Sequence, residues 1–87
     1  MEIAYSAKAL LDIEFWRKSG SKAIQKKISQ LIVAIQDNPY KGIGKPEALK
    51  HELSGKWSRR IDSEHRVIYE LNESDLSIKI HSLRGHY

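Results

Sequence analysis

The residues from Ser21 to Pro39, S-K-A-I-Q-K-K-I-S-Q-L-I-V-A-I-Q-D-N-P, decide the first half of the fold. Isoleucine and leucine recur in this stretch at spacings of three and four, which is the period of one apolar face of a helix. Lysines fall largely on the opposite side, Ser21 is a suitable N-cap, and Asn38-Pro39 ends the pattern. We therefore predict an amphipathic helix whose core-facing stripe consists of Ile24, Ile28, Leu31, Ile32 and Ile35.

Upstream of this helix, the sequence predicts a short strand and a first helix. Residues 2–5 alternate polar and apolar side chains, and residues 7–18 contain helix formers without a breaker after a good N-cap, Ser6. Ser19-Gly20-Ser21 then separates the two helices.

Downstream, the apolar period changes to two, which is typical of strands. Turn residues occur at 54–55, 62–64 and 72–75 and divide this half into four short strands. The strands that we expect are 49–53, with Leu49, His51 and Leu53 alternating; 57–61; 65–71, with Val67, Tyr69 and Leu71 inward; and 76–80, with Leu76, Ile78 and Ile80 inward.

These elements predict an α+β fold with the order β-α-α-β-β-β-β. The short turns favour antiparallel pairing, and two N-terminal helices would cover one face of a twisted antiparallel sheet. The other face would then remain open. At 87 residues, the chain has room for one domain, residues 1–87.

The amino-acid composition excludes some classes of function and favours others. The formal net charge is +4, which favours a polyanionic partner, nucleic acid first, although a generically basic surface has the same charge. The absence of cysteine excludes thiolate chemistry and agrees with a reducing cytoplasm. The longest apolar run, residues 31–35, is too short to cross a bilayer, so no membrane partner is expected.

The open face carries the candidate anion site. If Trp57, Ile61, Val67 and Tyr69 face the helices as core residues, then Arg60 and Arg66 share the uncovered face, and Lys50 is a candidate to join them. Guanidinium groups on rigid strands make a good phosphate clamp. The alternative is an ordinary solvated sheet face with cross-strand ion pairs.

Glu47 is the candidate proton acceptor beside this surface. It follows Lys45-Pro46, and proline favours an extended conformation of Lys45, which would stiffen the loop. A carboxylate near cations can act as a general base. The alternative is a surface carboxylate paired with Lys45 or Lys50.

The C-terminal His86-Tyr87 offers a proton donor and an aromatic ring that could stack on a base. A frayed tail without a role is the alternative. His51 is a weaker candidate, His65 suggests a structural hydrogen-bonding role, and His81 receives no role. Four histidines without cysteine or an H-E-x-x-H spacing predict no metal site and no cofactor.

Three blocks of the sequence resemble the YoeB (Txe) family of toxins. They are residues 42–61 (GIGKPEALKHELSGKWSRRI), residues 64–69 (EHRVIY) and the terminal His86-Tyr87. Their order and spacing are similar to the family's, and the resemblance extends over essentially the whole chain.

This resemblance implies a RelE-like fold and a ribosome-dependent endonuclease that acts on mRNA in the A site, without a metal and through a 2′,3′-cyclic phosphate. It implies that Glu47 is the general base, that Arg66 stabilises the transition state and that His86 is the general acid. Substrate binding is implied for Tyr87, Lys50, Arg60 and Lys45.

The resemblance also implies partners. They are the ribosome with its A-site mRNA and an antitoxin with an acidic C-terminal segment, through which the complex binds operator DNA. It leaves open whether the toxin is a monomer or a homodimer. One departure is Gly85, where a member of the family has an aromatic residue, and a glycine there would loosen the tail before His86.

Two other functions are consistent with parts of the sequence. A toxin relative directed at gyrase would have no reason to retain a matched glutamate, arginine and terminal histidine. A non-catalytic nucleic-acid-binding subunit of a repressor complex would use the phosphate clamp for affinity alone.

Overall fold

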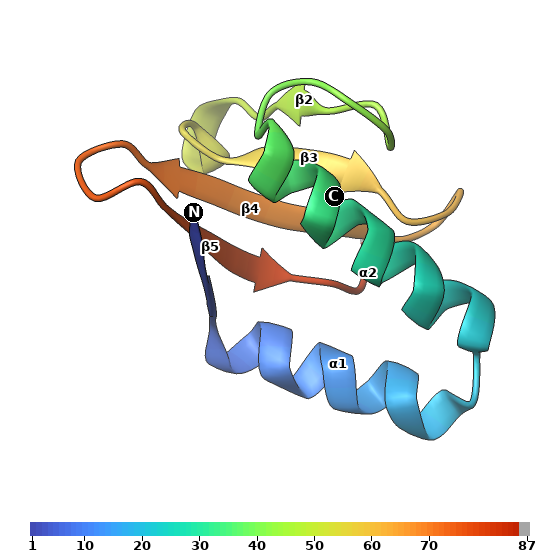
Figure 1. Ribbon diagram of the computed structural model, residues 1–87. Helices are drawn as coiled ribbons and strands as arrows, with labels where there is room; N and C mark the ends of the chain where they lie inside the picture. Colours follow the sequence, from blue (N-terminus) through green and yellow to red (C-terminus); the bar gives the residue numbers. More distant parts are fainter. Residues whose placement is uncertain (86–87) are drawn as a thin grey trace.

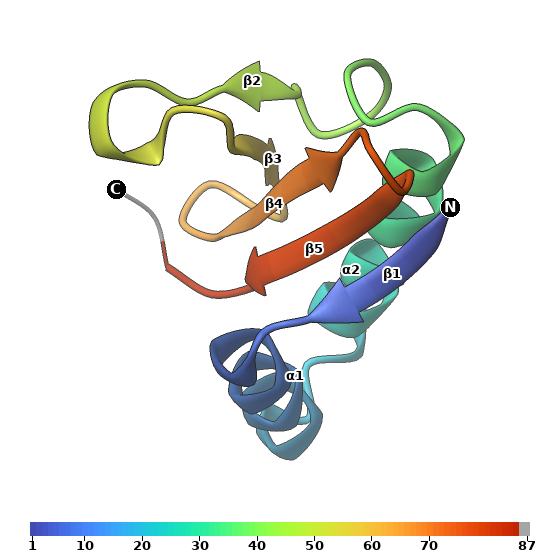
Figure 2. The same ribbon diagram turned by 90° about the vertical axis from the view of Figure 1, so that its left-hand side faces the viewer.

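A computed structural model describes residues 1–85 of the chain. Two helices lie on one face of a five-stranded sheet, and the element order β-α-α-β-β-β-β is confirmed (Figures 1 and 2). The elements are β1 (Glu2–Tyr5), α1 (Ala7–Ser19), α2 (Lys22–Asp37), β2 (Glu47–Ala48), the 3₁₀ helix η1 (His51–Leu53), β3 (Trp57–Arg60), β4 (Arg66–Asn72) and β5 (Ser77–Ser82).

The predicted caps begin both helices. The Ser6 hydroxyl accepts the N–H of Ala9 at 3.0 Å, and the Ser21 hydroxyl accepts the N–H of Ile24 at 3.4 Å. These bonds satisfy N–H groups that the first turn of a helix otherwise leaves unpaired. None of the helices within residues 1–85 is long and apolar enough to span a membrane.

The sheet is mixed, with the strand order β1-β5-β4-β3-β2. The β2–β3, β3–β4 and β4–β5 pairs are antiparallel as predicted, whereas β1 pairs parallel with β5. Figure 2 shows β1 at the edge of the sheet beside β5. The wholly antiparallel sheet was therefore wrong for this edge strand. The prediction rested on short turns between strands, and no short turn joins β1 to β5, because both helices and three strands lie between them in the chain.

The core lies between the helices and the near face of the sheet. It contains Ile28, Leu31 and Ile35 from α2, and Tyr69 is fully buried against it, as predicted. Trp57 is half-buried and packs on the edge of this core. The stripe predicted on α2 is thus the surface that α2 buries.

Two predicted strand segments differ. Residues 49–53 do not continue a strand, because His51 adopts a positive φ of 59° and begins η1. Leu76 was expected to face inward, but it has a φ of 54°, lies in the β4–β5 turn and is 61% exposed. In both places a left-handed residue ends the alternation on which the prediction rested.

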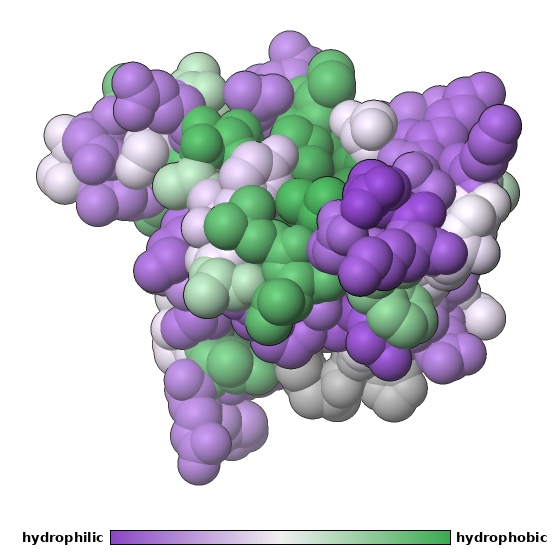
Figure 3. All heavy atoms as spheres, turned by 90° about the horizontal axis from the view of Figure 1, so that it is seen from below, coloured by the Kyte–Doolittle hydropathy of each residue, from purple (hydrophilic) through white to green (hydrophobic). Residues whose placement is uncertain are grey.

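The outer side of α1 leaves apolar side chains uncovered in the described structure. Viewed from the α1 side, apolar atoms form a patch between polar ones (Figure 3). Leu10, Leu11 and Phe15 of α1 are 56%, 71% and 40% exposed.

Candidate active site on the open face of the sheet

The strand register places three of the predicted site residues on one face. Glu47 pairs with Ser58, and Arg60 pairs with Arg66. Directly paired residues, and residues two apart in one strand, point to the same side of a sheet. Glu47, Arg60 and Arg66 therefore project from β2, β3 and β4 away from the helices, which confirms that both arginines share the open face.

Arg60 and Arg66 lie directly opposite each other across the β3–β4 pair. Like charges in this position destabilise a sheet, so a bound anion would relieve their repulsion. The Nη1 group of Arg66 donates to the carbonyl oxygens of Asp62 at 3.1 Å and His65 at 3.3 Å. These two bonds hold the Arg66 guanidinium against the β3–β4 turn, while Arg60 is exposed.

Asp62 shapes this turn. Its Oδ1 accepts the backbone N–H groups of Glu64 at 2.8 Å and His65 at 2.7 Å. Partial burial opposes ionisation of the carboxyl, but these two hydrogen bonds outweigh it and lower the pKa of Asp62. An ionised Asp62 thus keeps the backbone at His65 and Arg66 in place.

Glu47 and Lys50 share a shallow hollow of about 260 Å³ at the β2 edge. Both side chains are exposed, and Lys50 lies between β2 and η1 rather than in a strand. The hollow is lined by Glu47, Ala48, Leu49, Lys50, His51 and Leu53. Lys50 thus lies beside Glu47 at the β2 edge, in a loop rather than in a strand.

The loop before Glu47 is held by a residue that the sequence did not single out, Arg59. Arg59 is fully buried, and its Nε donates to the Tyr69 hydroxyl at 3.1 Å. Its two Nη groups donate to backbone carbonyl oxygens of the loop, at Ile43 (3.2 Å), Lys41 (3.0 Å) and Asn38. Arg59 alternates with Arg60, so the same period-two pattern that exposed Arg60 already placed Arg59 on the core side.

Tyr69 completes this buried network. Its hydroxyl donates to the carbonyl oxygen of Pro39 at 2.6 Å and accepts from Arg59. Burial raises the pKa of Tyr69, and the hydrogen bond from Arg59 partly opposes that rise. Arg59 and Tyr69 together tie the 38–44 loop to the sheet.

The glycine at position 44 is required by close packing. Its φ is +84°, and a Cβ there would lie 2.7 Å from Leu31 Cδ2 and 3.2 Å from the Arg60 carbonyl oxygen. Its own carbonyl oxygen accepts the Arg60 N–H at 2.7 Å. Lys45 follows with a φ of 52°, so the extended conformation predicted for it was wrong, because this tight turn overrides the effect of Pro46.

Lys45 lies near Arg60, and a helix adds a third cation. Lys45, Arg60 and Lys27 of α2 line one hollow of about 430 Å³, with Asp62 and Ser63 at the β3–β4 turn. Lys27 is one of the lysines that we expected to lie largely on the side of α2 opposite the apolar stripe. It is half-buried, and its spacing of three from Ile24 and four from Leu31 was the signal that it borders the apolar stripe.

The predicted roles of His86 and Tyr87 lie outside the described residues. The chain up to Gly85 reaches the open-face residues, because the Gly85 carbonyl oxygen accepts the backbone N–H of Arg66 at 3.0 Å. The expected effect of Gly85 on the tail that carries His86 also lies outside the described residues, and only Gly85 itself can be described. Its φ of 86° suits a glycine, and its N–H and carbonyl groups are both hydrogen bonded.

The other three histidines lie in different parts of the structure. His51 is exposed, and His81 contacts the Glu70 carboxylate at 2.7 Å. His65 makes a hydrogen bond through Nδ1 to the Gly85 N–H, so its predicted hydrogen-bonding role is confirmed. Within residues 1–85, no three histidine, aspartate or glutamate side chains are arranged to hold a metal ion.

Known proteins resemble the chain over its whole length. The model of the YoeB-like toxin of bacterial type II toxin–antitoxin systems matches residues 5–87. The chain belongs to this family. It is 47% identical over 87 residues to Toxin YoeB of Synechocystis sp., an alignment that covers 100% of this chain and 98% of that toxin. The family predicted from residues 42–61 and 64–69 is therefore confirmed.

Solved structures of YoeB proteins have the same fold. The YoeB/ParE toxin from Agrobacterium tumefaciens has a TM-score of 0.94 and 36% identity, with 100% of both chains covered. YoeB from Staphylococcus aureus is 41% identical, with 100% of this chain and 98% of that chain covered. Its structures include a dimer, with a TM-score of 0.88, and a heterotetrameric YoeB–YefM toxin–antitoxin complex, with a TM-score of 0.87.

Proposed function

We propose that this protein is a ribosome-dependent endoribonuclease that cleaves mRNA in the ribosomal A site without a metal ion. One observation carries the proposal. Glu47, Arg60 and Arg66 project from three neighbouring strands onto one open face, and the backbone of Arg66 binds the residue that precedes His86. A carboxylate, two guanidinium groups and the start of the His86 segment thus adjoin one surface.

In the proposed reaction, the Glu47 carboxylate takes the proton of a ribose 2′-hydroxyl. The 2′-oxygen forms a bond to the adjacent phosphorus, and the bond from phosphorus to O5′ breaks. His86 donates a proton to the departing O5′, which leaves as a 5′-hydroxyl beside a 2′,3′-cyclic phosphate. Each positioned proton transfer typically contributes about 10²–10⁴-fold to the rate.

Arg66 stabilises the negative charge that grows on the phosphoryl oxygens. Its guanidinium is already fixed against the β3–β4 turn, so it needs little reorganisation when the charge develops. Arg60, directly opposite, supplies a second cation to the same phosphate group. Their mutual repulsion without RNA and their attraction to a shared phosphate favour substrate binding.

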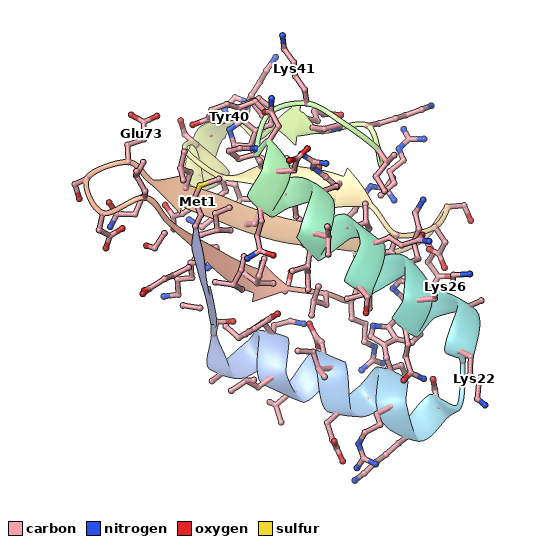
Figure 4. The ribbon with its side chains drawn as sticks, viewed as in Figure 1. Met1, Lys22, Lys26, Tyr40, Lys41 and Glu73 are labelled. Atoms are coloured by element: carbon pink, nitrogen blue, oxygen red, sulfur yellow. The ribbon has the colours of Figure 1, made fainter. Side chains whose placement is uncertain are left out.

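Lysines extend the binding surface on both sides of the arginines. Lys50 lines the hollow beside Glu47, whereas Lys45 and Lys27 line the hollow beside Arg60. Lys22 and Lys26, by contrast, project outward from α2, which lies on the other face of the sheet (Figure 4). Phosphates of mRNA and of ribosomal RNA are the partners that this surface fits. Tyr87 is the proposed stacking group for a base.

We further propose that an antitoxin with an acidic segment covers this basic face in the cytoplasm, and that the complex binds operator DNA through the antitoxin. The Staphylococcus aureus relative, which was solved with YefM and as a dimer, supports an antitoxin partner and a homodimer.

The test is cleavage of a programmed mRNA on purified ribosomes by the wild type and by Glu47→Gln, with the product ends mapped. We expect Glu47→Gln to bind ribosomes normally and to cut about 10²–10⁴-fold more slowly. Glu52→Gln is the matched control, because Glu52 is an exposed carboxylate of η1 that does not line the hollow.

Equal cleavage rates for Glu47→Gln and Glu52→Gln would show that Glu47 is not the general base. Intact mRNA with tightly bound wild-type protein would instead indicate a non-catalytic nucleic-acid-binding subunit.

A further inference from the structure

The segment that follows β5 is anchored on α1. The Leu83 N–H donates to Asp12 Oδ2 at 2.9 Å, and the Trp16 indole N–H donates to the Leu83 carbonyl oxygen at 2.9 Å. Leu83, Asp12 and Trp16 are all buried. The chain therefore leaves the sheet in a fixed direction, two residues before Gly85.

Gly85 is fixed by His65, which immediately precedes β4, and by Arg66, the first residue of β4. His65 Nδ1 accepts the Gly85 N–H at 2.9 Å, and the Arg66 N–H donates to the Gly85 carbonyl oxygen at 3.0 Å. That carbonyl belongs to the peptide bond that joins Gly85 to His86. The backbone on the N-terminal side of His86 is therefore bound to the residue whose guanidinium faces the open surface.

The His65 ring is itself held in one orientation. It packs edge-on against Trp16, with ring centroids 4.8 Å apart and an interplanar angle of 82°. The backbone N–H of His65 donates to Asp62 Oδ1, and its carbonyl oxygen accepts the Ile61 N–H at 2.9 Å. Because Nδ1 accepts a hydrogen bond, the neutral ring carries its proton on Nε2, which lies 3.5 Å from Glu64 Oε2.

We propose that His65 is a positioning residue that places the general acid, His86, through its hydrogen bond to Gly85. This inference rests on the proposed nuclease function. His65 itself does not touch the RNA or transfer the proton. Without the bond, Gly85 would keep one of its two anchors, and the backbone that leads into His86 would be less restrained. A displacement of about 1 Å can cost about 10²-fold in rate.

The test compares His65→Ala with His65→Asn. Both variants lose the imidazole ring and its contact with Trp16, but the Asn side-chain oxygen stands close to the place of Nδ1 and can accept the Gly85 N–H. We expect His65→Ala to lower the single-turnover cleavage rate on ribosomes about 10²-fold at unchanged ribosome affinity. His65→Asn should recover most of that loss. His81→Ala, which removes a histidine paired with Glu70 elsewhere in the sheet, is the control.

A second measurement separates positioning from general stability. In a His86→Ala background the acid is absent, so His65→Ala should cause little further loss of cleavage, whereas two independent effects would multiply. Equal losses in His65→Ala and His65→Asn would overturn the proposal in favour of ring packing. Wild-type cleavage by His65→Ala would overturn it outright.

Hydrogen exchange of the Gly85 amide tests the contact without any assay of cleavage. We expect faster exchange in His65→Ala than in the wild type or His65→Asn. Unchanged protection in His65→Ala would show that His65 does not hold Gly85. If the wild type cuts no mRNA but this difference in exchange is present, the nuclease proposal fails while the contact between His65 and Gly85 stands.

Discussion

Each face of the β3–β4 pair carries an arginine of β3, and the two arginines have different roles. Arg59 and Arg60 are neighbours in β3, yet Arg59 is fully buried and donates to four oxygen atoms, whereas Arg60 is exposed opposite another arginine. The pleat of the strand causes the difference, because consecutive residues point to opposite faces. A guanidinium that faces neutral carbonyl oxygens stabilises the fold, and one that faces a cation and solvent is available to an anion.

The largest effects are expected from replacing each of these two arginines with methionine. Arg59→Met leaves carbonyl oxygens of the 38–44 loop without their charged donor and should lower the free energy of unfolding by about 3 kcal/mol. Arg60→Met should change it by less than about 0.5 kcal/mol, but should slow cleavage about 10²-fold, because it removes a donor from the phosphate. Urea unfolding and ribosome cleavage assays on both variants measure the two effects.

The distinction between Arg59 and Arg60 would be contradicted if Arg59→Met and Arg60→Met had the same effects on unfolding and on cleavage. A stable Arg59→Met would mean that the loop does not depend on the buried guanidinium. A strongly destabilised Arg60→Met would mean that Arg60 belongs to the structural network.

A smaller effect is expected from Tyr69→Phe, on the buried face. The variant removes the hydroxyl that joins Arg59 to Pro39 and should cost about 1–3 kcal/mol. Burial raises the pKa of Tyr69 in the folded protein, so the unfolded chain loses this proton first as the pH rises. The stability that the folded protein gains from keeping the Tyr69 hydroxyl protonated is therefore complete below the ordinary tyrosine pKa of about 10. This stability is lost as the pH rises above that value.

Unfolding of the two proteins at a series of alkaline pH values measures this effect. The wild type should lose stability above about pH 10 more steeply than Tyr69→Phe. Tyr5→Phe is the control, since within residues 1–85 the Tyr5 hydroxyl makes no hydrogen bond to the protein. Parallel curves for the wild type and Tyr69→Phe would contradict the assigned role of Tyr69.

Local sequence patterns were sufficient to predict much of the fold. Serine caps and the apolar stripe on α2 are determined within a few residues, and both were predicted correctly. The alternation in β3 and β4 also placed Arg60 and Arg66 on one face. These features depend on the period of the backbone and need no knowledge of distant contacts.

The errors arose where distant segments decide the conformation. Nothing near β1 specifies that it pairs with β5, and in parallel. The left-handed conformation of Lys45 follows from the packing of Gly44 against Leu31 and Arg59, which come from two other elements. Arg59 was overlooked because its acceptors lie 16 to 21 residues away in a loop.

The candidate site was predictable only in part. Register brings Glu47 and the arginines to the same face, as residue alternation and the family resemblance had suggested. Lys27 comes from a helix, and its position beside Lys45 and Arg60 depends on how α2 crosses the sheet. The anchor of Gly85 on His65 joins residues 20 apart that no local motif connects.

The most direct test of the central claim, that the open face activates a ribose 2′-hydroxyl, is cleavage of an A-site codon with a single 2′-deoxyribose at the mapped cut position. The nucleophile is then missing while the phosphate, the base and the ribosome remain. We predict that the wild-type protein leaves this linkage intact and cuts the all-ribose control to give a 2′,3′-cyclic phosphate. Cleavage of the 2′-deoxy linkage at the normal rate would contradict the account, because water or another nucleophile would then attack the phosphorus.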